Sequence, residues 1–175
     1  MKEVVVIGGT SNSCLDAQEV ASDIGRNLAA RGITPLTCGV NFGLIAKVLD
    51  PLISLKLSCR AIIVKNSDEE NNIHPIVDRP EFVDSTSERK RYFLKNFNII
   101  IALPGGLGTH DEIFYFLTES KSGNWDGKII LVNFNGFFDP LINLLNHLVT
   151  SGALKKKYLL NVILSHDSKE VLSEL

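Results

Sequence analysis

A glycine-rich turn at residues 104–112 is the segment whose residue types and spacing most directly suggest chemistry. It reads Pro-Gly-Gly-Leu-Gly-Thr-His-Asp-Glu and follows the apolar run 99–103, which predicts a buried strand, a turn and a helix that begins at Thr109. Glycines let a backbone pass close to a ligand, and the free amides at the start of a helix attract anions, most often phosphates. The segment therefore predicts a phosphate-binding loop with Glu112 within reach of the ligand.

A second charged residue, Arg89, is expected next to this loop. Arg89 and Glu112 fall in early turns of two expected helices, residues 85–96 and 109–121, which start at the same edge of the sheet. A guanidinium forms paired hydrogen bonds with either a phosphate or a carboxylate. Arg89 can therefore pair with the phosphate or with Glu112.

Local spacing also allows a purely structural interpretation of these residues. Thr109-x-x-Glu112 and Ser85-x-x-Glu88 both match a capping box, in which a hydroxyl and a carboxylate satisfy free amides at a helix start. For Glu88 capping is strongly preferred over chemistry, and local spacing alone favours capping for Glu112 as well. Arg89 in a first turn opposes the helix dipole, which favours a function, but a solvated basic face explains it equally well.

The elements that must position these residues alternate between short apolar runs and longer amphipathic stretches, as in an α/β fold. Near-continuous apolar strands are typical of a parallel sheet buried on both faces. We predict a three-layer Rossmann-like sandwich, a mostly parallel sheet with helices on both faces, whose ligands bind beyond the carboxyl ends of the strands. The expected strands are 4–7, 33–38, 61–65, 99–103, 128–132 and 162–164, and the expected helices are 15–31, 43–57, 85–96, 109–121, 138–149 and 168–175.

Three connecting features complete this prediction. Residues 8–11 are expected to form a tight turn, and Pro51 is expected to kink or restart its helix. Residues 66–84 are polar and contain Pro75 and Pro80. They are expected to form a long loop of the kind that often serves as a lid or a binding segment.

Composition sets limits on partners and location. The chain is 45% apolar and 22% charged with a net charge of −2, so no basic excess suggests nucleic acid. No stretch approaches the ~20 apolar residues of a membrane span, and the strand that follows Glu3 does not resemble a signal peptide. We therefore expect a cytoplasmic protein that binds neither nucleic acid nor membrane.

The cysteines and histidines show no spacing typical of a metal site. Cys14, Cys38 and Cys59 are far apart, which indicates reduced thiols, and Cys38 is interpreted as a buried thiol rather than a nucleophile. No Gly-Lys-Ser/Thr follows the glycine turn, so the turn is not a Walker A loop and ATP hydrolysis is not expected.

The paired segments Ser87-Glu88-Arg89-Lys90 and Pro104-Gly105-Gly106-Leu107-Gly108-Thr109-x-x-Glu112 resemble the motifs of the LOG family. These proteins are cytokinin riboside 5′-monophosphate phosphoribohydrolases, often labelled lysine decarboxylases. The resemblance extends weakly over nearly the whole chain and implies one nucleotide-binding domain over residues 1–175. It implies a homodimer that cleaves the N-glycosidic bond of a purine nucleoside 5′-monophosphate, AMP or a cytokinin riboside monophosphate, to free base and ribose 5-phosphate. No metal or cofactor is implied, and nothing resembles a pyridoxal phosphate site.

Carried over by position, the resemblance implies that Arg89 and Glu112 are the catalytic pair. The substrate-binding residues that it implies are Gly9, Thr10, Gly39, Gly43, Lys90, Gly105, Gly106, Leu107, Gly108 and Thr109.

Two other functions fit parts of the same pattern. A non-catalytic nucleotide-binding protein or molybdenum cofactor carrier would share the Val-Ile-Gly-Gly opening and the Gly-Gly-x-Gly-Thr-x-x-Glu segment. Carriers lack the Glu-Arg-Lys segment, so Arg89 favours the enzyme. A regulatory or DNA-processing relative is a third interpretation, against which the absence of a basic excess speaks.

Overall fold

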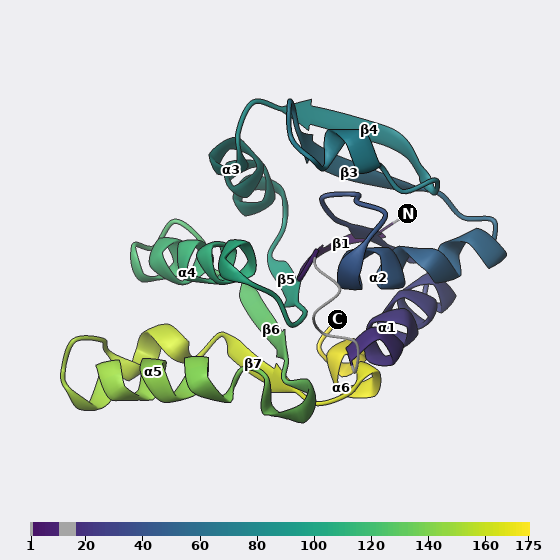
Figure 1. The fold of residues 1–175 in the computed structure, drawn as a ribbon. Helices are drawn as coiled ribbons and strands as arrows, with labels where there is room; N and C mark the ends of the chain where they lie inside the picture. The colour runs from purple at the N-terminus through teal and green to yellow at the C-terminus, as the bar shows by residue number, and fades with distance from the viewer. Residues whose placement is uncertain (1, 11–16) are drawn as a thin grey trace.

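The computed structural model describes residues 2–10 and 17–175 and shows an α/β fold around a parallel five-stranded sheet (Figure 1). The sheet order is β2-β1-β5-β6-β7, and β3 and β4 form a second parallel pair. The strands are β1 Lys2–Ile7, β2 Ile33–Leu36, β3 Cys59–Val64, β4 Val77–Val83, β5 Ile99–Ala102, β6 Lys128–Val132 and β7 Val162–Ser165. The helices are α1 Gln18–Ala30, α2 Gly43–Ser54, α3 Thr86–Asn96, α4 Leu107–Lys121, α5 Asp139–Thr150 and α6 Ser168–Ser173.

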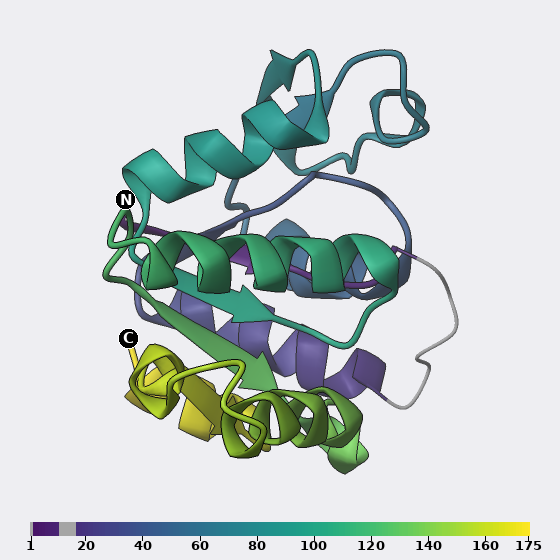
Figure 2. The same ribbon diagram turned by 90° about the vertical axis from the view of Figure 1, so that its left-hand side faces the viewer.

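Helices cover both faces of the sheet, which confirms the predicted fold class. Alternate strand residues point to opposite faces, so neighbours such as Val4 and Val5 enter different cores. One core packs against α1, α2 and α6, and the other packs against α3, α4 and α5. Figure 2 looks onto the second of these faces, with α3, α4 and α5 in front of the sheet.

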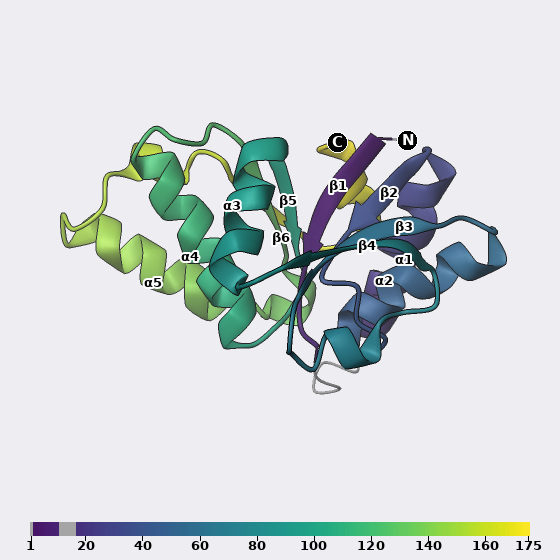
Figure 3. The ribbon, with the colours of Figure 1, turned by 90° about the horizontal axis from the view of Figure 1, so that it is seen from above.

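The predicted loop over residues 66–84 is wrong in its second half. Residues 70–72 form a short 3₁₀ turn, and Val77–Val83 form β4, which pairs in parallel with β3. Figure 3 shows this pair from above. Within the described residues β4 pairs with β3 alone, so it is an edge strand and most of its residues are exposed. A proline such as Pro80 is tolerated in an edge strand. Its polar sequence therefore does not predict a strand.

The second strand pair is joined to the main sheet at the end of β2. Thr37 forms a parallel bridge with Ala61, and the N–H of Ile62 donates a hydrogen bond of 3.0 Å to the Thr37 carbonyl oxygen. This contact fixes the β3–β4 connection next to the carboxyl edge of the main sheet.

Smaller differences concern element ends. Helix α2 includes Pro51 without a break and ends at Ser54, before the predicted end at residue 57. Helix α4 begins at Leu107, two residues before the predicted start at Thr109. Ser11, Cys14 and the expected helix start at residue 15 lie outside the described residues.

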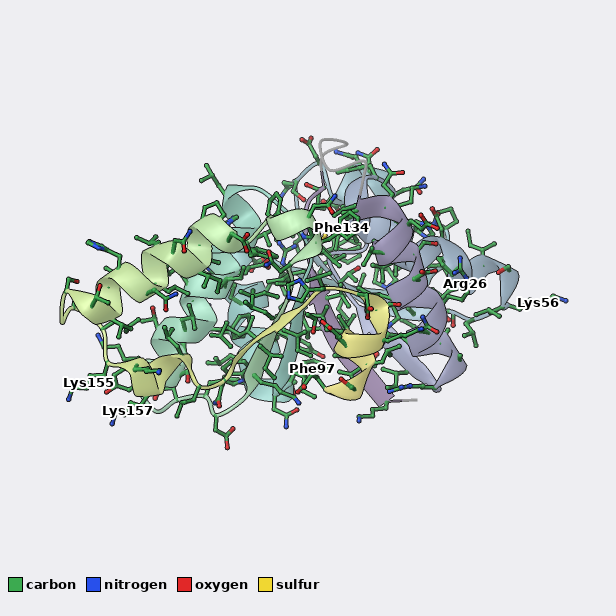
Figure 4. The ribbon with its side chains drawn as sticks, turned by 90° about the horizontal axis from the view of Figure 1, so that it is seen from below. Arg26, Lys56, Phe97, Phe134, Lys155 and Lys157 are labelled. Atoms are coloured by element: carbon green, nitrogen blue, oxygen red, sulfur yellow. The ribbon has the colours of Figure 1, made fainter. Side chains whose placement is uncertain are left out.

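The connection after α5 lies far from the first two helices. Figure 4 shows Lys155 and Lys157 at one end of the molecule, and Lys56 at the opposite end with Arg26 of α1 on the same side. Within the described residues, no helix combines the length and the apolar character needed to cross a membrane.

Candidate active site

A cavity of about 340 Å³ lies at the carboxyl edge of the sheet, where the predicted phosphate loop was expected. Loops after β1 and β2, the β3–β4 connection, and helices α3 and α4 all contribute to its wall. Small-molecule sites typically have volumes of about 300–1,000 Å³. The residues that line it are Val6, Ile7, Gly8, Gly9, Thr10, Cys38, Ile45, Glu69, Arg89, Phe93, Gly106, Leu107, Gly108, Thr109 and Glu112.

Three of the predicted glycines bring separate loops together at the floor of this cavity. The N–H of Gly9 donates a hydrogen bond of 2.9 Å to the Pro104 carbonyl oxygen, which joins the loops after β1 and β5. A Cβ on Gly105 would lie 2.7 Å from the Gly9 nitrogen, and one on Gly43 would lie 2.5 Å from the Gly9 oxygen. Gly43 also has a φ of +65°, a conformation that favours glycine. A side chain at either position would force the loops apart.

Gly39, Gly43 and Gly105 shape the cavity without being among its lining residues. Gly39 has a φ of +72°, and a Cβ on it would lie 2.5 Å from the Cβ of Ala61 on β3. The predicted role of these three glycines in binding substrate stays a prediction. In the structure these three glycines allow close packing, because a Cβ at each would meet neighbouring atoms at short distance.

The start of α4 presents its free amides at the rim of the cavity. Gly106 is the N-cap residue, and Leu107, Gly108 and Thr109 form the first helical turn, whose N–H groups have no acceptor within the helix. Gly106, Leu107 and Gly108 are exposed, and Leu107 is 92% exposed. The helix dipole places partial positive charge here, so an anion would be stabilised at this rim.

The capping prediction is wrong for Thr109 and Glu112 and confirmed for Ser85 and Glu88. Thr109 is the third residue of α4, not its N-cap, so Glu112 has no capping partner. At α3, the Ser85 hydroxyl oxygen accepts a hydrogen bond of 3.2 Å from the N–H of Glu88. The Glu88 carboxylate in turn accepts one of 2.8 Å from the N–H of Asp84.

Arg89 lies between two carboxylates in the cavity wall. Its side chain is 9% exposed; Nη1 lies 2.6 Å from Glu69 Oε2, and Nε lies 3.8 Å from Glu112 Oε1. Nε is buried and has no hydrogen-bond partner among the described residues. Burial on its own would lower the pKa of Arg89, but the facing Cys38, Glu112 and Glu69 outweigh it and raise that pKa. Arg89 is therefore positively charged at neutral pH.

Glu112 has the electrostatics of a group that exchanges protons near neutrality. Burial raises its pKa to about 7, against the lowering effect of Arg89, and the Glu69 and Asp111 carboxylates add to the rise. Perturbed acids of this kind cluster at functional sites. Glu112 is thus suited to accept or donate a proton at physiological pH.

Lys90 points away from the cavity. Its Nζ lies 2.6 Å from Asp111 Oδ2 and stands over the ring of Tyr115, 5.1 Å from the ring centre. The pair joins α3 to α4 directly beside Arg89 and Glu112. Its predicted contact with substrate stays a prediction, and Lys90 is not among the cavity-lining residues.

Cys38 lines the cavity, and burial raises the pKa of its thiol to about 12. A thiol with so high a pKa is a poor nucleophile at neutral pH, as the sequence indicated, but Cys38 is half-buried rather than fully buried. In the part of the chain that the structure describes, no group of three or more His, Cys, Asp or Glu side chains is arranged to hold a metal ion.

Glu69 is the site residue that sequence reasoning missed. It lies in the segment 66–84, which was expected to be a long loop of the kind that often serves as a lid or a binding segment. Nothing in its local sequence distinguishes it from its neighbours Asp68 and Glu70. Its place in the cavity wall depends on its contact with Arg89, 20 residues later in the chain.

The parallel sheet and the cavity at its carboxyl edge define a Rossmann-like α/β protein with a candidate anion site. A family model described as "Possible lysine decarboxylase" matches residues 46–175. Because this match covers most of the chain and the curated relatives are LOG proteins, the protein belongs to the LOG family of this class.

The curated relatives are similar over most of the chain at low identity. Cytokinin riboside 5′-monophosphate phosphoribohydrolase LOG3 of Arabidopsis thaliana is 25% identical over 171 residues, 98% of this chain and 80% of that protein. The probable phosphoribohydrolase LOGL1 of Oryza sativa subsp. japonica is 28% identical over 137 residues, 78% of this chain and 61% of that protein. The chain spans 61% and 65% of the length of the rice proteins LOGL1 and LOGL2.

Solved structures share the fold. A molybdenum cofactor binding protein from Rippkaea orientalis matches with a TM-score of 0.71 and 19% identity, over 98% of this chain and 93% of that one. A Moco carrier protein from Chlamydomonas reinhardtii matches with a TM-score of 0.69 and 17% identity, over the same shares of the two chains. At these identities the likeness establishes the fold alone.

Proposed function

We propose that the protein hydrolyses the N-glycosidic bond of a purine nucleoside 5′-monophosphate, AMP or a cytokinin riboside monophosphate, to free base and ribose 5-phosphate. The observation that carries this proposal is the buried Arg89–Glu112 pair in the wall of a cavity whose rim is the start of α4. The names of the curated relatives describe the same reaction.

The substrate would lie with its phosphate at the rim and its sugar toward the interior. The amides of residues 107–109 and the α4 dipole favour a dianionic phosphate. Glu112 is one helical turn further along α4 than Gly108, so a ribose attached to that phosphate would extend toward the carboxylate. Gly9 and Thr10, which line the cavity across from α4, would border the ligand.

The proposed reaction is a displacement by water at the ribose C1′ carbon. The water oxygen forms a bond to C1′ while the bond from C1′ to the base nitrogen breaks, and the electron pair of that bond stays on the base, which takes up a proton from solvent. Glu112 in its ionised form accepts the proton that the water loses and afterwards returns it to solvent. The same carboxylate stabilises the positive charge that develops on the sugar in such transition states.

Arg89 would act on both the substrate and Glu112. Its cationic charge favours the ionised form of Glu112, and its unpaired Nε–H is available to a ligand oxygen or to the carboxylate. We assign it the role of orienting Glu112 and binding the ribose or the phosphate. No metal or organic cofactor takes part in this mechanism.

We also propose that the protein is a homodimer that buries an apolar patch on and beside α4. Leu107 and Phe114, seven residues apart, lie on one helix face and are 92% and 37% exposed. Phe137, also 37% exposed, lies near His110, with 6.5 Å between the ring centres. This patch adjoins the cavity rim, so a second copy would border the site.

The test is chromatographic detection of free base after the purified protein is incubated with AMP, isopentenyl-AMP, GMP, CMP and adenosine. We expect release from purine monophosphates but not from adenosine, and loss of release in Glu112→Gln. Glu119→Gln, a change on the same helix away from the cavity, is the matched control and should retain activity. Nucleotide binding without base release from any of them would contradict hydrolysis and favour the carrier alternative.

A further inference from the structure

We propose that Glu69 is a positioning residue of the site, which holds the Arg89 guanidinium and so sets the charge and orientation of Glu112. This inference rests on the proposed function for its role in turnover. The contact itself, Arg89 Nη1 to Glu69 Oε2 at 2.6 Å, belongs to the structure whatever the substrate is.

Arg89 is closer to Glu69 than to Glu112, its proposed catalytic partner. Its end nitrogen Nη1 donates a short hydrogen bond to Glu69, whereas Nε stands 3.8 Å from Glu112 Oε1, beyond hydrogen-bond distance. The Nε–H group remains buried without a partner among the described residues. Glu69 therefore keeps the guanidinium from closing completely on Glu112 and leaves one N–H group available.

Glu69 is itself held from two sides. Its Oε2 accepts a hydrogen bond of 3.2 Å from the N–H of Val64, the last residue of β3. Its carbonyl oxygen accepts one of 3.1 Å from the N–H of Asn72, and the Asn72 carbonyl oxygen accepts one of 2.8 Å from the N–H of Asn41. The Glu69 side chain is thus anchored to β3, and its main chain is anchored through Asn72 to the loop after β2. The side chain is 20% exposed.

The charges around Glu112 show what Glu69 contributes. Arg89 and Lys90 of α3 lower the pKa of Glu112, whereas burial, Glu69 and the neighbouring Asp111 raise it. The Cys38 thiol also faces this group and is neutral, since its pKa is about 12. A single cation shared between two carboxylates compensates each of them incompletely. Removing the Glu69 charge would leave Arg89 to Glu112 alone and favour the ionised carboxylate.

The experiment compares Glu69→Gln with Glu70→Gln, which removes the same charge from the next residue. Glu70 accepts a hydrogen bond from the N–H of Asn66 and does not line the cavity. In Glu69→Gln we expect the acid limb of the kcat profile to move about one unit to lower pH and the plateau to fall about tenfold. Glu70→Gln should leave the position of the limb unchanged. An unmoved limb in Glu69→Gln, or an equal shift in both variants, would overturn the proposal.

Glu69→Asp separates the effect of the carboxylate charge from the effect of side-chain length. It keeps the carboxylate and shortens the side chain by one methylene, so the acid limb should stay near its wild-type position while the plateau falls. A limb that moves as far in Glu69→Asp as in Glu69→Gln would show that charge is not the cause.

An NMR titration of Glu112, which does not depend on catalytic activity, separates this proposal from the proposed function. In protein labelled with ¹³C at the glutamate carboxyl carbons, the Glu112 signal is identified by its loss in Glu112→Gln and titrated by NMR. Its midpoint should fall in Glu69→Gln and stay in Glu70→Gln, even if the wild type cleaves none of the nucleotides tested. In that case the proposed function fails while Glu69 still sets the state of Glu112, whereas an unchanged midpoint refutes the role of Glu69 itself.

Discussion

Glu112 is buried, and the positive charge of Arg89 only partly compensates its negative charge. Both activity and stability should therefore depend on the protonation of this one residue. A carboxyl whose pKa is about 7 in the folded protein changes its charge within the physiological range, whereas an exposed glutamate does not. Activity and stability should therefore depend on pH in opposite directions through this one group.

The first prediction concerns activity. If Glu112 takes a proton from water, the ionised form is active, so kcat/KM should rise with pH and reach half of its plateau near pH 7. At pH 6 it should lie about tenfold below the plateau. Steady-state rates of base release between pH 5 and pH 9 check this, and activity that instead declines above pH 7 would assign Glu112 the role of an acid.

The second prediction concerns stability. The folded-state pKa of Glu112 is raised from 4.5 to about 7, so its contribution is fully present below pH 4.5 and is lost as pH rises through 7. Glu112→Gln removes that loss, and should be more stable than the wild type at pH 8 by on the order of 2 kcal/mol but not at pH 5. Urea unfolding at both values gives the comparison, and an equal difference at the two pH values would contradict it.

At the scale of elements, the site depends on loops from β1, β2 and β5 that meet closely enough to require glycine. Gly105 and Gly108 are both predicted phosphate-loop residues, but their surroundings differ. A Cβ at Gly105 would meet backbone at 2.7 Å, whereas one at Gly108 would meet nothing within 4 Å.

We therefore predict that Gly105→Ala lowers the free energy of unfolding by about 2 kcal/mol, because the loops must separate to admit the methyl group. Gly108→Ala is the matched control and should be neutral or stabilising by up to about 1 kcal/mol, since alanine favours a helix. Denaturant unfolding of the two variants decides this. An equal loss of unfolding free energy in the two variants would contradict the close contacts that the structure shows around Gly105.

The elements also show what sequence predicts and what it does not. The apolar runs of β1, β5 and β6 predict the sheet, because burial on both faces leaves a clear pattern, and the glycine turn after β5 predicts where the cavity lies. Strand β4 is mostly exposed and contains Pro80, so no pattern of apolar residues marks it as a strand, although it pairs with β3. Glu69 joins Arg89 across 20 residues of chain, and such a contact depends on tertiary placement alone.

At the scale of the whole molecule, the prediction is a dimer that covers the α4 patch. Sedimentation equilibrium should give twice the chain mass of 19.3 kDa. Phe114→Lys would place a charge within the patch and should shift the protein toward monomer, whereas Leu160→Lys, an exposed site outside the patch (73% exposed), should leave it dimeric. A monomer in the wild type would contradict the proposed assembly.

The place of β1 between β2 and β5 in the sheet has a consequence for how the protein acquires its site during folding. β1 pairs with β2 through Val5 and Leu36, but its other neighbour, β5, is reached through Val5 and Ile100, about 95 residues further along the chain. Contacts between such distant segments form slowly. The hydrogen bond from Gly9 to Pro104 joins the two halves of the cavity floor across the same gap. Helical signal should therefore return early in refolding, and binding of the proposed nucleotide should return only when β1 pairs with β5.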